Sequence, residues 1–235
     1  MTTSTYCKIV TQEMAPWALC LAVALSAQLA PAGEVIGSSG RIGSFLLRAG
    51  HGRLAAVPRG TPPGELSPPS TPILVAAPAE ALREVLRATP SDRVADLVLL
   101  SNGMVLEHAE AVLGTEAAAT LSAGVLYFGV LTPGGAPVHG PGAPPSALAG
   151  RHAEAVAALL QDAAPGLRCQ VLSSLSELRD VASQKMIWAS ALWLLCAARR
   201  CTVSEVRARC GEMCDAWQMA GQRSRSRELR CREPD

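Results

Sequence analysis

The sequence predicts an α/β protein, in which a parallel sheet with flanking helices is followed by a small all-α C-terminal domain. Between residues 34 and 145, short unbroken apolar runs alternate with amphipathic stretches, which is typical of buried parallel strands joined by helices. From residue 146 onward the pattern is mainly helical. Hydrophobic residues make up 49% of the 235 residues and aromatic residues only 3%, so the core must consist of Ala, Leu and Val.

The individual elements follow from these runs and from the turn residues that bound them. The apolar strands are expected at residues 35–36, 54–57, 73–78, 96–100, 124–131 and 168–172. The helices are expected at residues 44–49, 80–88, 107–113, 147–161, 174–199 and 203–220. Because strands and helices alternate in the first part of the chain, they form successive βαβ units.

This pattern divides the chain into four parts. Residues 34–145 form the sheet domain, residues 146–220 the helical domain, and residues 221–235 an arginine-rich tail that we expect to be solvated and disordered. Residues 1–33 contain an apolar run from position 16 to position 32 that is similar to the apolar region of a targeting sequence. The sequence leaves a cytoplasmic and an organellar location open. A targeting sequence is one interpretation of this run, and a buried helix, a membrane anchor or an incorrectly assigned start are the alternatives.

Charge and composition exclude several classes of protein. A net charge of +1 provides no overall basic field, so we expect no nucleic-acid partner. The apolar run near the N-terminus is too short and too rich in alanine for a secure membrane span, so membrane binding is not expected. The eight cysteines lack the spacing of a metal site or a disulfide scaffold, and the four histidines are scattered, so we expect no bound metal.

A glycine-rich turn follows the first strand. Gly37, Gly40 and Gly43 are spaced G-x-x-G-x-x-G, and glycines at such a turn let backbone N–H groups approach a pyrophosphate at a helix N-terminus. The second strand is followed by Arg59, and a cation at this position suits the extra phosphate of NADP rather than the ribose hydroxyls of NAD. The sequence therefore predicts a Rossmann-type NADP site, and a plain strand–helix turn is the alternative.

Four segments, taken in order, resemble one known family. They are the glycine turn with Val-Pro-Arg-Gly at 57–60, Leu-Leu-Ser-Asn-Gly at 99–103, Val-His-Gly-Pro-Gly at 138–142 and Lys-Met-Ile-Trp at 185–188. Together they are similar to the ketopantoate reductases and their relatives, of which this chain would be a divergent member. The resemblance implies a Rossmann NADP-binding domain and a helical second domain like that of phosphogluconate dehydrogenase.

The resemblance also implies roles for particular residues. Lys185 would be the catalytic residue, which polarises and protonates a carbonyl that accepts a hydride. Asn102 would hydrogen-bond near the nicotinamide ribose. The cofactor would be held by the residues Gly37, Ser38, Gly40, Arg41 and Ile42 at the pyrophosphate, Arg59 at the adenosine phosphate, and Ala76 with Ala77 beneath the ribose.

The function that follows is an NADP-dependent oxidoreductase that acts on the carbonyl or hydroxyl group of a small acid. The family has asparagines four and eight residues after the lysine, whereas this chain has Ala189 and Trp193. The alternative is therefore a non-catalytic NADP-binding or protein-interaction homologue on the same scaffold. The expected partners are a small-molecule substrate and a second copy of the chain, bound through the helical domain. Trp188 and Trp193 are expected to pack within the core or between helices.

Overall fold

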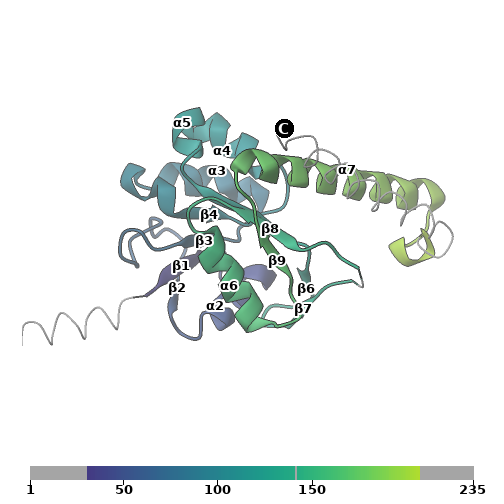
Figure 1. Cartoon of the computed structure of the whole chain (residues 1–235), viewed down its shortest axis with the longest axis horizontal. Helices are drawn as coiled ribbons and strands as arrows, with labels where there is room; N and C mark the ends of the chain where they lie inside the picture. The colour runs from purple at the N-terminus through teal and green to yellow at the C-terminus, as the bar shows by residue number, and fades with distance from the viewer. Residues whose placement is uncertain (1–30, 141, 207–235) are drawn as a thin grey trace, which may run out of the picture.

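The computed structural model describes residues 31–140 and 142–206, so residues 1–30 of the targeting-like segment, residues 207–220 of the last expected helix and the arginine-rich tail lie outside the described residues. A seven-stranded sheet with the order β2-β1-β3-β4-β5-β8-β9 forms the centre of the molecule (Figure 1). Strands β1 to β5 are parallel to one another. The Rossmann-type α/β fold expected from the sequence is thereby confirmed.

The first half of the chain builds the parallel part of the sheet. Because β1 pairs with both β2 and β3, the strand order reverses direction between β1 and β3. In α/β sheets such a switch point is where ligands bind, at the carboxyl ends of the strands. The elements of this half are β1 (Gly33–Ile36), α2 (Arg41–Ala49), β2 (Leu54–Ala56), β3 (Ile73–Val75), α3 (Ala79–Ala88), η1 (Ser91–Asp96), β4 (Leu97–Leu99), α4 (Val105–Leu113), α5 (Thr115–Ala118) and β5 (Ser122–Val125).

The second half extends the same sheet. Strand β8 pairs antiparallel with β5, β9 pairs parallel with β8, and β6 and β7 form a separate hairpin. The sheet therefore runs past residue 145, where the sequence pattern places the start of the helical part. The elements are β6 (Gly129–Val130), β7 (Pro137–Val138), β8 (Ser146–Ala149), α6 (Ala153–Ala163), β9 (Cys169–Val171) and α7 (Leu175–Arg199).

Two expected elements differ from the structure. The helix expected over residues 147–161 is instead strand β8 followed by α6. The alanine-rich sequence of β8 favours a helix locally, but Leu148 packs against Gly124 of β5, where a side chain on the glycine would collide with it. The single strand expected over residues 124–131 is divided between β5 and β6, because the chain leaves the central sheet after Val125.

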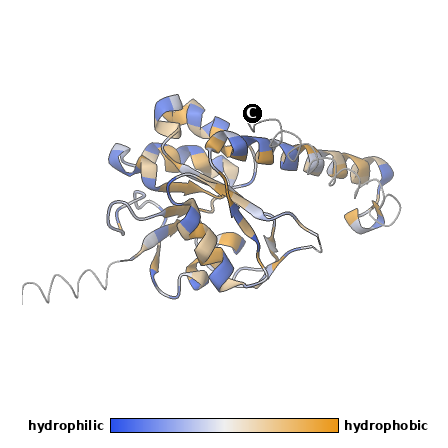
Figure 2. Cartoon of the chain, viewed as in Figure 1, coloured by the Kyte–Doolittle hydropathy of each residue, from blue (hydrophilic) through white to orange (hydrophobic). Residues whose placement is uncertain are grey.

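Helices cover both faces of the sheet, so the fold has three layers (Figure 1). One core lies between the sheet and α3, α4, α5 and the start of α7. The other lies between the sheet and α2 with α6. The central strands β3 and β4 consist of large apolar residues only (Figure 2). Ile73, Leu74 and Val75 of β3 are all fully buried, as expected for a strand covered on both faces.

Helix α7 begins over the sheet and extends beyond it (Figure 1). Ser174 caps its N-terminus by accepting a hydrogen bond from the Glu177 N–H at 3.2 Å. Its end is set by Arg200, whose φ of 49° lies in the left-handed region. Among the described residues α7 alone has the length and apolar composition to cross a membrane, with a mean hydropathy of 1.3 over a window that is 11% buried.

Candidate functional site

The glycine turn lies at the switch point of the sheet. Gly37 follows β1 with a φ of +79°, and a Cβ atom there would lie 2.7 Å from the Ala76 carbonyl oxygen that follows β3. Gly43, on the first turn of α2, has no room for a side chain because the Gly37 carbonyl oxygen occupies that place. Two of the three glycines are therefore required by close backbone packing.

The N-terminus of α2 is open at this turn. Gly40 is the N-cap residue, and no side chain among the described residues caps the helix. The half-buried Ser38 and Ile42 and the exposed Gly40 and Arg41 surround the end of the helix. Uncapped N–H groups at a helix N-terminus, next to glycines that keep the approach clear, suit an anionic group such as a pyrophosphate.

Arg59 and Ala76 lie at the ends of the two strands that neighbour β1. Arg59 is exposed three residues beyond β2, and within the described part of the chain it makes no ion pair. The Ala76 N–H donates to the Ile36 carbonyl oxygen at 3.0 Å, so Ala76 lies beside the end of β1. Ala77 is buried, and its carbonyl oxygen accepts a hydrogen bond from Ser101 Oγ at 2.6 Å.

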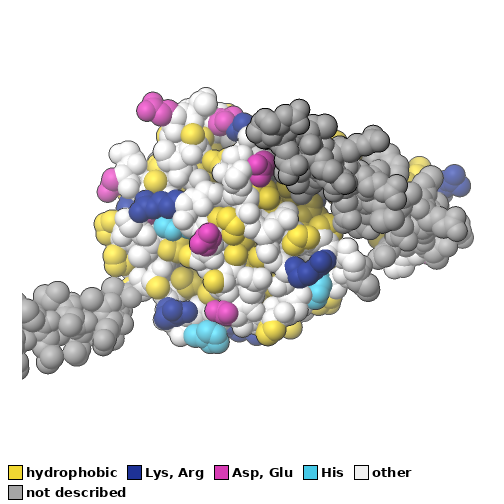
Figure 3. Space-filling view, viewed as in Figure 1, with side chains coloured by type: hydrophobic (Ala, Val, Ile, Leu, Met, Phe, Trp, Pro, Cys, Tyr) yellow, Lys and Arg dark blue, Asp and Glu magenta, His cyan; other side chains and the backbone are white. Residues whose placement is uncertain are grey.

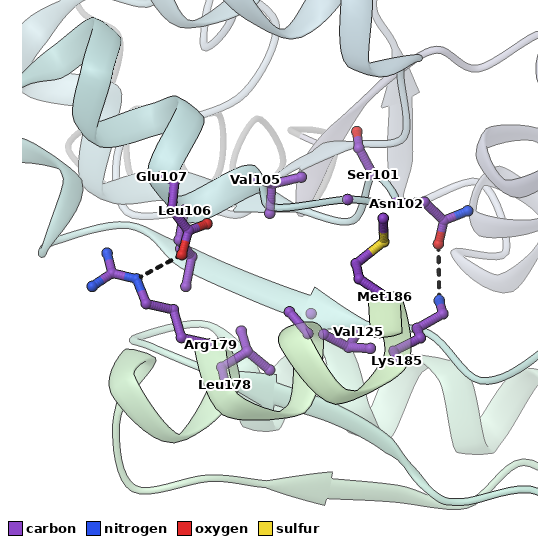
Figure 4. Close-up of a pocket in the computed structure, with 13 residues that line it drawn as sticks. Ser101, Asn102, Val105, Leu106, Glu107, Val125, Leu178, Arg179, Lys185 and Met186 are labelled. Atoms are coloured by element: carbon purple, nitrogen blue, oxygen red, sulfur yellow. Dashed lines mark hydrogen bonds and ion pairs between the residues drawn. The ribbon is translucent and has the colours of Figure 1, made fainter. Parts of the chain in front are cut away.

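Lys185 of α7 lies beside the carboxyl end of β4, and its side chain points toward Asn102 (Figure 4). Its Nζ atom donates to Asn102 Oδ1 at 2.9 Å and to the Leu126 carbonyl oxygen at 2.8 Å. The same atom lies 5.5 Å from the centre of the Tyr127 ring. Burial lowers the pKa of Lys185 from its ordinary value of 10.5, because removal from water disfavours the ammonium form.

The structure therefore brings together residues that are far apart in the sequence. Asn102 follows β4 and Lys185 lies on the third turn of α7, yet their side chains are hydrogen-bonded. The contact arises because α7 packs against β5 and β8, which places one of its faces beside the end of β4. Arg59 is separated from this pair by β1 and β3 in the sheet order, so it belongs to the other end of the site.

Residues that the sequence analysis missed line the pocket next to Lys185. The pocket lies between the loop after β4, helix α4 and the start of α7, and Val125, Leu178 and Met186 provide its apolar lining. Arg179 also lines it and pairs with Glu107 at 3.2 Å and with Glu110. The spacing of Glu107 and Glu110 places both on one face of α4, but only the packing of α7 shows their partner.

The two positions that differ from the resembled family lie further along α7. Trp193 is 68% exposed, two helical turns beyond Lys185, and Ala189 lies between them. Trp193 is not among the residues that line the pocket. On the face drawn in Figure 3, the basic and the acidic side chains of the described residues are interspersed over the sheet domain.

Comparisons with known proteins return solved structures only. No protein-family model matches the chain, and no curated protein matches it. A PanE/ApbA family ketopantoate reductase from Ralstonia eutropha JMP134 is similar, with a TM-score of 0.43, 15% identity, and coverage of 77% of this chain and 80% of that chain. This is the family that the sequence motifs resemble.

Two further solved structures are similar to this chain, with comparable TM-scores and sequence identities. The ternary structure of D-mandelate dehydrogenase with NADH and anilino(oxo)acetate has a TM-score of 0.43 and 16% identity, and the match covers 70% of this chain and 63% of that chain. A conserved hypothetical protein from Sinorhizobium meliloti 1021 has a TM-score of 0.37 and 17% identity, and covers 74% of this chain and 66% of that chain.

Proposed function

We propose that the protein is an NADP-dependent oxidoreductase that transfers a hydride between the cofactor and the carbonyl or hydroxyl carbon of a small acid. The observation that carries this proposal is the position of Lys185. Its ammonium group, with a lowered pKa, is held by Asn102 and the Leu126 carbonyl oxygen at the carboxyl edge of the sheet. The neighbouring pocket is lined by apolar side chains and by the paired Arg179 and Glu107.

The residues at the switch point fit a dinucleotide. Gly37 and Gly43 let the turn and the start of α2 pack closely against β1 and the segment after β3. The uncapped start of α2 presents the N–H groups near Gly40, Arg41 and Ile42 as hydrogen-bond donors to a pyrophosphate. Arg59 is free to contact a phosphate on the adenosine ribose. When bound, NADPH supplies the hydride.

Lys185 then completes the reaction at the substrate. A carbonyl carbon that receives a hydride leaves negative charge on its oxygen, and the Lys185 ammonium stabilises that charge and donates a proton to it. The product is the alcohol, and Lys185 is left neutral until it regains a proton from water. Asn102 holds the ammonium group in place through its side-chain carbonyl oxygen.

The choice of NADP rests on Arg59, and nucleotide binding tests it. In Arg59→Ala we expect the affinity for NADPH to fall by about 10- to 100-fold, because a charge-assisted phosphate contact is lost. The affinity for NADH, which lacks that phosphate, should stay the same. Arg53→Ala is the matched control, because Arg53 is also exposed but precedes β2. Equal losses for the two nucleotides would contradict NADP specificity, and no binding of either would overturn the proposal.

A second function on the same scaffold is favoured by one observation. Ala189 and Trp193 lack the side-chain amides that the resembled family has at these positions for its substrate, so the chain would bind NADP without turnover. A screen of 2-oxo acids with NADPH separates the two functions. Oxidation of NADPH that disappears in Lys185→Ala supports the enzyme, whereas tight NADPH binding without turnover of any acid supports the non-catalytic protein.

A further inference from the structure

The turn at the end of α7 has a cysteine on either side of it. Arg200 adopts a left-handed conformation there, with a φ of 49°, and two backbone hydrogen bonds close the turn around it. The Arg200 N–H donates to the Ala197 carbonyl oxygen at 3.3 Å, and the Cys201 N–H donates to the Cys196 carbonyl oxygen at 3.1 Å. This pair of nested hydrogen bonds around a left-handed residue defines a Schellman motif.

Cys196 and Cys201 occupy the two positions of this motif whose side chains commonly touch. A contact between the residue that accepts the longer of the two hydrogen bonds and the residue that donates it frequently accompanies a Schellman motif. The structure has this arrangement, because Cys196 is buried in a cluster with Leu192 and Val206, and Cys201 packs against the same cluster. The turn therefore places both thiols on one side of the chain.

The backbones of the two cysteines are also close enough for a disulfide bond. A carbonyl oxygen lies about 2.4 Å from the Cα atom of its own residue, and an amide nitrogen lies about 1.5 Å from its own. With the 3.1 Å hydrogen bond between Cys201 and Cys196, the two Cα atoms are less than about 7 Å apart, which is the limit beyond which a disulfide requires the backbone to move.

The two thiols are free in the structure and differ in exposure. Cys201 is half-buried, whereas Cys196 is buried. Both line a pocket at the end of α7, together with Trp193, Arg200 and Glu205. Burial raises the pKa of the Cys196 thiol, and negative charge on Cys201 and Glu205 raises it further. Cys201 is therefore the thiol that a reagent reaches first, and Cys196 is placed to react with a sulfur atom held at Cys201.

We propose that Cys196 and Cys201 form a reversible dithiol–disulfide pair, which a small disulfide such as glutathione disulfide oxidises. The Cys201 thiolate attacks one sulfur of the small disulfide, forms a mixed disulfide and releases one thiolate. The Cys196 thiolate then attacks the Cys201 sulfur, forms the protein disulfide and releases the second thiolate. The two protein thiols lose two electrons and two protons, and the small disulfide becomes two thiols. This pair does not rest on the proposed function.

Oxidation ties the end of α7 to the segment that follows it. Thr202 and Glu205 begin that segment with a capping box, in which the Thr202 N–H donates to Glu205 Oε2 at 2.7 Å and the Glu205 N–H donates to Thr202 Oγ1 at 3.3 Å. The left-handed conformation of Arg200 is unfavourable for a residue with a side chain. The disulfide holds that conformation in place, so it fixes the direction in which the chain leaves α7.

The first test is the pairing itself, in the full chain. The protein is equilibrated with glutathione and glutathione disulfide, alkylated, and digested with trypsin, which cuts after Arg199 and Arg200. Mass spectrometry should find peptide 186–199 joined to peptide 201–207, in protein that has the mass of a single chain. Cys169→Ser is the matched control and should leave this link unchanged, because Cys169 lies in β9.

Two outcomes of this test would overturn the proposal. One is that both thiols stay reduced in glutathione disulfide alone. The other is that Cys196 or Cys201 joins a different cysteine in preference to its neighbour across the turn.

The order of the two steps is tested with single variants. In Cys196→Ser the second thiol is missing, so Cys201 should keep a bound glutathione, seen as an added mass on peptide 201–207. In Cys201→Ser the buried Cys196 should carry at least about 10-fold less glutathione after the same time. Equal modification of the two variants would overturn the proposed order of attack.

The contribution of the turn is tested at Arg200. Arg200→Gly adopts the left-handed conformation without strain, so the disulfide should form at least as readily as in the wild type. Arg200→Val opposes that conformation, because its side chain is branched at Cβ. It should require about 10-fold more glutathione disulfide, at a fixed glutathione concentration, for half of the pair to be oxidised. The same requirement in both variants would overturn the assignment of the pair to this turn.

Discussion

At the scale of single residues, the proposed chemistry depends on the protonation of Lys185. Burial lowers its pKa, while its two hydrogen bonds to Asn102 and to the Leu126 carbonyl oxygen keep the amine in one position. A lysine in such a place changes its charge closer to neutral pH than an exposed lysine does. In the proposed mechanism, the contact with Asn102 would therefore affect the rate as well as the position of the amine.

Two results are expected from Lys185. Lys185→Met should lower kcat for carbonyl reduction by about 10²- to 10⁴-fold, because the proton donor is lost, while the affinity for NADPH stays unchanged. In the wild type, reduction requires the ammonium form, so kcat should fall as pH rises through a pKa below 10.5. The oxidation direction needs the neutral amine and should show the opposite trend. Steady-state rates across pH measure both, with Met186→Leu as the control for a nearby pocket residue.

A pH profile without any ionisation below the ordinary lysine value would contradict the role of Lys185. So would a Lys185→Met variant that keeps the wild-type rate. Loss of NADPH binding in that variant would instead indicate that the lysine helps to hold the cofactor.

At the scale of elements, the β1–α2 turn is built on close backbone contact. Gly43 brings the first turn of α2 against the Gly37 carbonyl oxygen, and Ser44 Oγ accepts a hydrogen bond from the Gly134 N–H at 2.8 Å. The start of α2 therefore contacts both the segment that follows β1 and the β6–β7 hairpin. An element of this kind tolerates little added volume.

Gly43→Ala tests this packing. The added methyl group must displace the Gly37 carbonyl oxygen, so we expect the free energy of unfolding to fall by at least about 2 kcal/mol, which exceeds the gain from a better helix former. Urea unfolding monitored by circular dichroism measures it. Gly129→Ala is the matched control, because a methyl group there meets nothing within 4 Å. A Gly43→Ala variant as stable as the control would contradict the argument.

At the scale of the whole molecule, a buried charge network ties distant segments together. Asp96 accepts hydrogen bonds from Arg93 Nε at 2.8 Å and from the Ser70 N–H at 2.9 Å, and it lies 3.4 Å from His152 Nε2. It thereby joins the loop before β3, the turn before β4 and the start of α6. Burial lowers the pKa of His152 below 6.5, and this outweighs the hydrogen bond and the charge of Asp96, which act in the opposite direction.

The network predicts how stability depends on pH. Because the folded state disfavours a charged His152, the unfolded chain takes up the proton first as pH falls below 6.5. The free energy of unfolding should therefore decrease from pH 6.5 down to the folded pKa of His152. His152→Gln cannot gain this charge and should lose less stability over that range. Urea unfolding at several pH values, with the exposed His139→Gln as control, measures the difference, and equal declines would contradict the assignment.

Most of the parallel sheet could be predicted from the sequence, because each strand carries its own signal. Residues 73–78 and 97–100 are apolar without interruption, and the structure places β3 and β4 there. The alanine-rich β8 carried no such signal. Its strand conformation depends on pairing with β5 and on cover from α6 and α7 on its two faces, which are contacts between distant parts of the chain.

The sequence by itself determined the order of the main strands and helices from β1 to β5 and the residues that are candidates for the site, because glycine spacing and apolar periodicity are local properties. Only the tertiary structure decided which of those residues meet. The 2.9 Å contact of Lys185 with Asn102 and the pairing of Arg179 with Glu107 both depend on where one long helix packs against the sheet. That packing depends on contacts among many buried side chains. These side chains come from distant parts of the chain, so no single stretch of sequence predicts it.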